Sequence, residues 1–482
     1  MGHFHFGYLI HMMSILWDFT PCIYGFHPRN IRTVNVIANF IFLIMAAISS
    51  AFSWKFARFG KRKALIISSI IIFIGSSLLY IRSLSAMIIG RGIVGFGFGI
   101  SSVVGPLFIN EIAGSKYIEY CIATIQFWIN IGFLIPSLLD FSLPREGRIN
   151  PSNPENCLNF EGFHFIWREM IIPITLASVI QFVFLLLVFK KENPIYVQHC
   201  KDISHSLGAA TRESTQELYH SGINYEEDSQ QSSAKVETCL EKDTWKNMWK
   251  LSERKKIIAS MIVRGFQQLT GMNVILNYGL TFIYDTRFPR ISLSFSGSVT
   301  SMFFLIPSVY LLKKFGRKSL MMTGMIMACF SCCILFQMAD QLAIVDHFIP
   351  IFGSMPNLTT TIFVWVFTIS FWLNLASTPV LYCTETLTDK GMSIVTAFHW
   401  SLVTFVILLP SLAMAIFEQL YSNANFRSTN AFFFFLFSGT AMIGFFCTAL
   451  FVVETKGKSK RQLSEDFKER VFSLRSSKIY KN

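Results

Sequence analysis

The sequence is divided into apolar segments of roughly twenty residues, separated by short polar or charged stretches. A helix rises about 1.5 Å per residue, so such a segment is long enough to cross a hydrocarbon core of about 30 Å. Hydrophobic residues make up 52% of the chain and charged residues only 15%, with 50 phenylalanines among 482 residues. A soluble domain cannot keep so much apolar surface out of water, so the composition indicates an integral membrane protein.

We predict an all-α membrane protein with twelve transmembrane helices. The predicted spans are residues 4–26, 35–56, 64–81, 86–109, 119–139, 168–189, 257–283, 292–312, 319–338, 360–382, 392–417 and 430–452. The first segment lacks the basic start and the small-residue cleavage site of a signal peptide, so we expect it to remain as a span.

The formal net charge of +13 comes from basic residues that are clustered. They concentrate at residues 58–63, at residues 313–318 and between Lys456 and Lys481. The predicted spans place all three clusters on one side of the membrane, and the positive-inside rule predicts that this side is cytoplasmic. Both termini are then cytoplasmic. The excess charge orients the chain in a lipid bilayer, and we expect no nucleic-acid partner.

The two halves of the chain repeat the same short patterns. RFGKR at residues 58–62 and KFGRK at residues 314–318 each join two apolar spans, and two spans later Glu111 and Glu385 occupy matched positions. Two related six-helix bundles would form a site at their interface that can open to either side. The predicted domains are a first bundle (1–190), a cytoplasmic connector (191–255), a second bundle (256–454) and a basic cytoplasmic tail (455–482).

Three longer motifs resemble the sugar porters of the major facilitator superfamily, in the fungal hexose transporter style. They are GRGIVGFGFGISSVVGPLFINEIA at residues 90–113, QQLTGMN at residues 267–273 and VETKGKS at residues 453–459. The resemblance implies two pseudo-symmetric bundles, transport of a monosaccharide (a hexose such as glucose) by alternating access, and residence in the plasma membrane. The glycine-rich stretch lies inside an apolar span and does not follow a strand, so it is not a nucleotide-binding loop.

The predicted seventh span carries several side-chain amides. An amide without a partner in hydrocarbon costs several kcal/mol, whereas each amide can both donate to and accept from a sugar hydroxyl. Gln267, Gln268 and Asn273 cannot share one helical stripe unless the helix breaks, and Gly271 permits a break. The alternative is that these amides only hold helices together. By resemblance, the substrate-binding residues are Gln126, Gln267, Gln268, Asn273, Asn277 and Trp400, with Tyr278 as an outer gate.

Two positions of this site depart from the family pattern. His399 stands where the family has an asparagine before the tryptophan, and Val380 stands where the tenth span has an aromatic residue. The apolar face of a sugar is therefore expected to be less covered.

The first span leaves the mode of transport open. Phe6-Gly7-Tyr8 resembles a family motif that ends in an acid, but Leu9 would then replace the acid, so we favour Asp18 as that acid. Arg91 is its expected partner, and protonation of such a pair would couple sugar movement to protons. Facilitative relatives keep both residues, and we favour facilitated diffusion over proton symport.

A cytoplasmic latch is expected from Arg58, Arg62, Glu111, Arg317 and Glu385. Several family positions have changed: Ala57 and Lys313 replace acids, and Ile118-Glu119 replaces an Arg-Gly pair. We therefore predict a weaker latch and a population shifted toward the inward-open state.

Other functions remain as alternatives. The same amides would serve an inositol or another polyol, and a non-transporting sugar sensor could share the fold, although the short tail favours transport. We expect no enzyme activity, no cofactor and no metal, because neither a catalytic triad nor a paired-histidine motif is present.

Overall fold

The computed structural model describes residues 2–16, 31–113, 117–142, 163–189, 251–275, 290–340, 356–420 and 426–469. Within these residues, each of the twelve predicted segments contains helix. The first half consists of α1 (Phe4–Leu16), α3 (Ile31–Arg58), α4 (Lys61–Leu78), α5 (Leu84–Ile112), α6 (Ile118–Ser142) and α7 (Phe163–Leu187).

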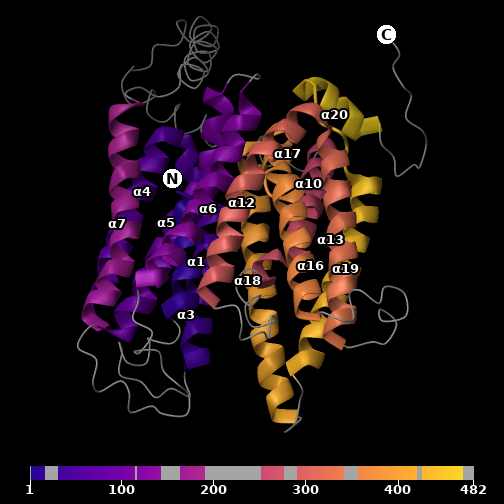
Figure 1. Cartoon of the computed structure of the whole chain (residues 1–482). Coiled ribbons are helices and arrows are strands. Elements are labelled where there is room, and N and C mark those ends of the chain that lie inside the picture. The colour runs from indigo at the N-terminus through magenta and orange to yellow at the C-terminus, as the bar shows by residue number, and fades with distance from the viewer. Residues whose placement is uncertain are drawn as a thin grey trace, which may run out of the picture.

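The second half forms a matching bundle beside the first (Figure 1). Helix α10 begins at Leu251, inside the predicted connector, and the rest of the connector from residue 191 to 250 lies outside the described residues. The helices are α10 (Leu251–Leu269), α12 (Arg290–Lys314), α13 (Arg317–Asp340), α16 (Pro356–Ser370), η3 (Phe371–Leu375), α17 (Thr378–Thr386), α18 (Asp389–Leu420), α19 (Phe426–Phe451) and, in the tail, α20 (Lys460–Glu469).

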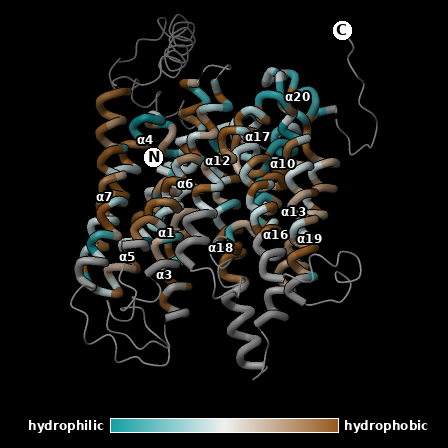
Figure 2. The backbone as a smooth tube through the Cα atoms, in the orientation of Figure 1, coloured by the Kyte–Doolittle hydropathy of each residue, from teal (hydrophilic) through white to brown (hydrophobic). Residues whose placement is uncertain are grey.

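Hydropathy is distributed as a bilayer requires. Eight of the described helical segments are long and apolar enough to cross a membrane. The helices on the outside of the bundles, such as α7, are strongly hydrophobic, whereas α20 is hydrophilic and lies at one end (Figure 2). We call that end the basic face: it carries α20 and the turns at residues 59–60 and 315–316.

Small residues set the spacing of the first bundle. A Cβ at Gly95 would lie 2.2 Å from the carbonyl oxygen of Phe42, and one at Gly99 would lie 2.3 Å from that of Ala46. Helix α5 therefore packs with its backbone directly against α3, which is how helices associate where lipid offers no hydrophobic drive. The glycines that look like a nucleotide loop in the sequence have this packing role.

The halves meet along two helix pairs. Helix α3 of the first half packs along α18 of the second, and α6 packs along α12. The buried core extends across this boundary, because Phe6 and Phe98 of the first half share one hydrophobic cluster with Trp400 of the second. Residues on α5, α6, α10, α17 and α18 are thus placed to meet between the halves.

Two spans of the second half are broken. The seventh span stops at Leu269, Gly271 adopts a φ of +86°, and helix resumes at residue 272, so the predicted break is confirmed. The tenth span has three pieces: α16 runs into the π-helical η3, and α17 follows after Ala376 and Ser377. Breaks of this kind free backbone groups in the interior, and those groups need partners.

We predict that Gly271→Ala destabilises the protein by about 1–3 kcal/mol, because a side chain at positive φ is strained. A Cβ there would also lie 2.4 Å from the Phe437 ring. The variant should melt at a lower temperature in detergent, followed by a thiol-reactive dye. Gly439→Ala is the control: nothing lies within 4 Å of its Cβ position, so it should melt no lower than the parent. Equal melting of G271A and the parent would contradict the prediction.

Candidate functional site

The break in the tenth span is the meeting point of amides from both halves. Gln126 of α6 donates from Nε2 to the Ala376 carbonyl at 2.8 Å. Gln267 of α10 donates from Nε2 to the same carbonyl at 3.2 Å and to the Leu375 carbonyl at 2.8 Å. Gln126 is only 8% exposed and Gln267 only 3%. Two predicted binding residues thus converge on one backbone segment between the bundles.

Local sequence explains why the Leu375 carbonyl is available. In a continuous helix, the Leu375 carbonyl would accept from the N–H of residue 379, but Pro379 has no N–H. The π-helical segment before it ends with a bond from the Ala376 N–H to the Phe371 carbonyl, 2.9 Å long. The Gln267 side-chain amide takes over the donor role that the backbone cannot fill at Leu375.

A second set of amides lies on the other side of α10. Asn273 donates from Nδ2 to Oε1 of Gln268 across the Gly271 break. Nε2 of Gln268 lies 3.5 Å from Nε2 of His399, and Nδ1 of His399 lies 3.5 Å from the Arg264 carbonyl. The proton of His399 therefore belongs on Nδ1, so that Nε2 accepts from the amide. Gln267 and Gln268 face different neighbours, as their adjacency in the sequence requires.

Trp400 on α18 contributes an aromatic ring that contacts α5 and α1 of the first half. Its indole N–H donates to Oγ of Ser102 on α5 at 3.0 Å, which is a further bond between the halves. Its ring lies 4.8 Å from the Phe98 ring and 4.9 Å from the Phe6 ring, centroid to centroid. Val380, the position that lacks the family's aromatic residue, is buried in the same cluster.

Two buried polar residues near these amides were not predicted. Asn130 lies one helical turn from Gln126 on α6 and is 0% exposed, yet neither side-chain atom has a partner among the residues that the structure describes. Arg264 lies one turn before Gln267 and donates from Nη1 to its Oε1 at 2.9 Å. Both carry a signal that the sequence already contained: an amide and a guanidinium inside apolar spans.

Arg91 is buried and is held by contacts that the sequence did not predict. Arg91 is 0% exposed, and it donates to the carbonyls of Ala38 and Leu9 and to Oδ1 of Asn39. Leu9, which we aligned with the family's acid and then set aside, is thus the α1 residue beside Arg91. Asp18 lies outside the described residues, so its pairing with Arg91 stays a prediction. Asn277 and Tyr278 also lie outside them.

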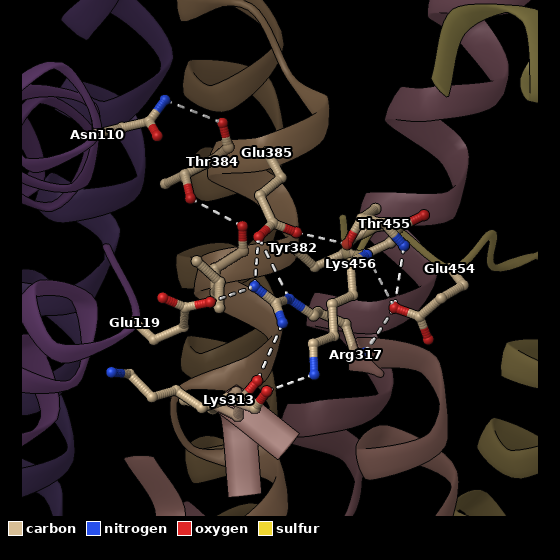
Figure 3. Close-up of polar contacts among 12 residues, drawn as sticks. Asn110, Glu119, Lys313, Arg317, Tyr382, Thr384, Glu385, Glu454, Thr455 and Lys456 are labelled. Atoms are coloured by element: carbon tan, nitrogen blue, oxygen red, sulfur yellow. Dashed lines mark hydrogen bonds and ion pairs between the residues drawn. The ribbon is translucent and has the colours of Figure 1, made fainter. Parts of the chain in front are cut away.

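At the basic face, Arg317 joins the two halves. The guanidinium bonds Glu385 of its own half at 2.8 Å and Glu119 of α6 at 3.0 Å (Figure 3). Thr455 donates to the other oxygen of Glu385, and Glu454 accepts from the backbone N–H of Arg317 at 2.8 Å. A carboxylate at the start of α13 suits the positive end of the helix dipole.

The first half repeats this arrangement with Lys61. Its ammonium pairs with Glu111 of its own half and with Asp389 of α18, the latter at 3.2 Å. Lys61 and Arg317 begin equivalent helices, α4 and α13, and each contacts one acid of its own half and one acid of the other. Asn110 adds a bond between the halves, from Nδ2 to the Thr384 carbonyl at 3.3 Å.

The latch itself stays a prediction, but the residues at this face can be compared with those that the sequence suggested. Glu111, Arg317 and Glu385 take part in the ion pairs there, whereas Lys61, Glu119 and Asp389 were missed. Arg62 donates instead to the Leu185 carbonyl at 3.1 Å, and Arg58 lies over the Trp54 ring at 4.5 Å. The substitution at position 119, read from the sequence as a loss, supplies a carboxylate to Arg317. The predicted shift of the population toward an opening on this face stays a prediction.

The described part of the chain contains no group of three or more His, Cys, Asp or Glu residues that could hold a metal ion. The amides between the bundles have donors and acceptors suited to hydroxyl groups. The ion pairs at the basic face could break and re-form if the bundles move. Both sets of residues make contacts that cross from one bundle to the other.

Comparison with known proteins gives consistent matches along the chain. A family model described as "Sugar (and other) transporter" matches residues 1–467. Hexose transporter 1 of Plasmodium yoelii yoelii is 24% identical over 483 residues, covering 95% of this chain and 88% of that protein. Solute carrier family 2, facilitated glucose transporter member 2, of Sus scrofa is 26% identical over 454 residues, covering 91% and 78%.

A solved structure of the proton:xylose symporter XylE, bound to 6-bromo-6-deoxy-D-glucose, superposes with a TM-score of 0.67. It is 18% identical and covers 97% of each chain. This likeness shows the fold of the major facilitator superfamily, with twelve helices in two bundles.

We predict that Glu119→Gln loosens the basic face, because it removes one carboxylate from Arg317 in a partly buried network. About 1 kcal/mol corresponds to about a fivefold shift between closed and open states. Cys383, buried on α17, is the reporter. Its alkylation by a polar reagent, measured by mass spectrometry of the peptide, should speed up about fivefold.

Asp466→Asn is the matched control, because Asp466 pairs with Lys458 within the tail and not with the other half. An unchanged alkylation rate in E119Q would count against the latch, and an equal rise in D466N would show that the effect is not specific to it.

Proposed function

Because the chain belongs to the sugar (and other) transporter family, we propose that it carries a monosaccharide across a membrane by alternating access, and that a hexose such as glucose is its substrate. It is an integral, multi-pass membrane transporter and not an enzyme. The names of the matched relatives, a hexose transporter and a glucose transporter, support a hexose as the substrate to test first.

One observation carries this proposal: Gln126 of one half and Gln267 of the other donate to the same carbonyl, that of Ala376. A sugar hydroxyl both donates and accepts, so it can take the place of either side of this contact. Gln268, Asn273, Asn277 and Trp400 complete the binding site, with Tyr278 as the outer gate. Each neutral bond contributes about 0.5–1.5 kcal/mol, which suits a carrier that must release its substrate.

The transport cycle follows from what crosses between the bundles. In the described conformation, ion pairs of Lys61 and Arg317 hold the basic face together. A sugar that enters between the amides replaces the Gln126 contact at the tenth-span break. This replacement changes the equilibrium between the state that is closed at the basic face and the state that is open there. Rocking of one bundle against the other then exposes the sugar on the opposite side.

We place the basic face and both termini in the cytoplasm and the protein in the plasma membrane, on the strength of the positive-inside rule and the family resemblance. Facilitated diffusion is the proposed mode. In support, the family resemblance implies that facilitative relatives keep both the acid, here Asp18, and Arg91, so this pair does not by itself require coupling to protons. Proton symport through Asp18 and Arg91 is the alternative, and transport of an inositol or another polyol is the second.

Counterflow in liposomes tests the function. Liposomes with the purified protein should exchange labelled glucose for unlabelled glucose, and a panel of other monosaccharides and polyols is tested in the same way. We expect that a pH gradient does not drive accumulation of glucose and that an uncoupler does not reduce the exchange rate. We predict that Gln126→Ala raises the KM about two- to tenfold, because one hydrogen bond to the sugar is lost. Gln462→Ala, which changes an exposed amide of α20, is the control. Absence of counterflow for every sugar would overturn the proposal.

We further predict opposite effects of Asn130→Leu on stability and on binding. A buried amide without a partner lowers stability, so its apolar replacement should raise the melting temperature in the absence of sugar. If Asn130 serves a sugar hydroxyl, as its place one turn from Gln126 indicates, the same variant should raise the KM several-fold. A variant that is more stable with an unchanged KM would remove Asn130 from the site.

A further inference from the structure

Arg264 is a cation in the interior of the proposed binding site. It lies in the seventh span, is 8% exposed and is one turn from Gln267. Its guanidinium bonds Oε1 of Gln267, whose Nε2 reaches the Ala376 carbonyl that Gln126 of the first half also contacts. The guanidinium therefore lies between the bundles, beside the amides that receive the sugar.

Among the residues that the structure describes, the guanidinium has few hydrogen-bond partners. It has five N–H donors, and the structure gives it one hydrogen bond, to Oε1 of Gln267. No ion pair among the described residues includes Arg264: those pairs lie at the basic face, within α10 between Glu253 and Lys256, or in the tail. A buried charge without a counter-ion destabilises the folded protein.

Arg91 shows what a buried structural arginine looks like in this protein. It is also fully enclosed, but its donors reach the carbonyls of Ala38 and Leu9 and the amide oxygen of Asn39. Three acceptors from two other helices fix that side chain in place. Arg264 lacks such a set, so burial of its charge is not explained by the packing of the described helices.

We propose that Arg264 receives an anionic group of the substrate, so that the carrier takes acidic monosaccharides, carrying a carboxylate or a phosphate ester, in preference to neutral ones. The inference rests on the proposed function and deepens it. A planar guanidinium matches either anion with two parallel hydrogen bonds. Pairing neutralises the buried charge, and the hydroxyls of the same sugar meet the amides of Gln126 and Gln267.

Competition binding to the purified full-length protein tests this proposal. Labelled glucose is displaced by unlabelled glucose, glucuronate or glucose 6-phosphate, the last two distinguishing a carboxylate from a phosphate. At least one acidic sugar should compete at a concentration about ten- to a hundredfold lower than glucose, the range of a hydrogen bond to a charged group. R264Q should lose that advantage, measured as the ratio of acidic-sugar affinity to glucose affinity in the same variant. R264K, which keeps the charge without the planar guanidinium, should lose part of it.

Arg168→Gln is the matched control, since it removes an exposed arginine at the start of α7. Glucose binding without competition from either acidic sugar overturns this inference and leaves the proposed function standing. Binding of no sugar at all overturns both. Equal losses of glucose and acidic-sugar binding in R264Q and R264K would indicate a structural arginine and also overturn it.

Discussion

The need to satisfy backbone carbonyls inside the membrane governs this structure. Pro379 leaves the Leu375 carbonyl without its helical donor, and lipid offers none. Side chains of α6 and α10 provide the donors, which draws one helix from each half toward Ala376 and Leu375. The same donors are the groups that a sugar requires. Under the proposed function, this contact between the halves is therefore also one that a substrate can replace.

The ion pairs at the basic face follow the internal symmetry of the chain. Lys61 and Arg317 each hold an acid of their own bundle and reach an acid at the start of α6 or α18 in the other. The charges lie at equivalent positions in both halves, so each half contributes one cation and one acid to the pairs between the bundles. Movement of one bundle against the other must break both pairs, so the network acts on the balance between states as a unit.

Much of the fold was predictable because membrane spans can be recognised in a sequence by their length and hydropathy. Each predicted segment contains helix, and the break at Gly271 followed from the spacing of Gln267, Gln268 and Asn273 on a helix. The site was less predictable. Glu119 was read as a loss, because a single position does not show that its carboxylate lies 3.0 Å from Arg317, 198 residues away. The prediction named Arg58 and Arg62 and not Lys61, because the sequence does not show which of these neighbouring cations faces the acids of the other half.

By itself the sequence determined the twelve apolar segments, the repeat of the two halves and the polar residues that cannot face lipid. These follow from local chemistry, since each depends on residues within one span or one turn. Only the tertiary structure decided which partners those polar residues take among the described residues: Ala376 for Gln126, Leu9 for Arg91, and the Gln267 amide for Arg264. Partner choice depends on how helices far apart in the chain pack, and packing is set by the whole bundle.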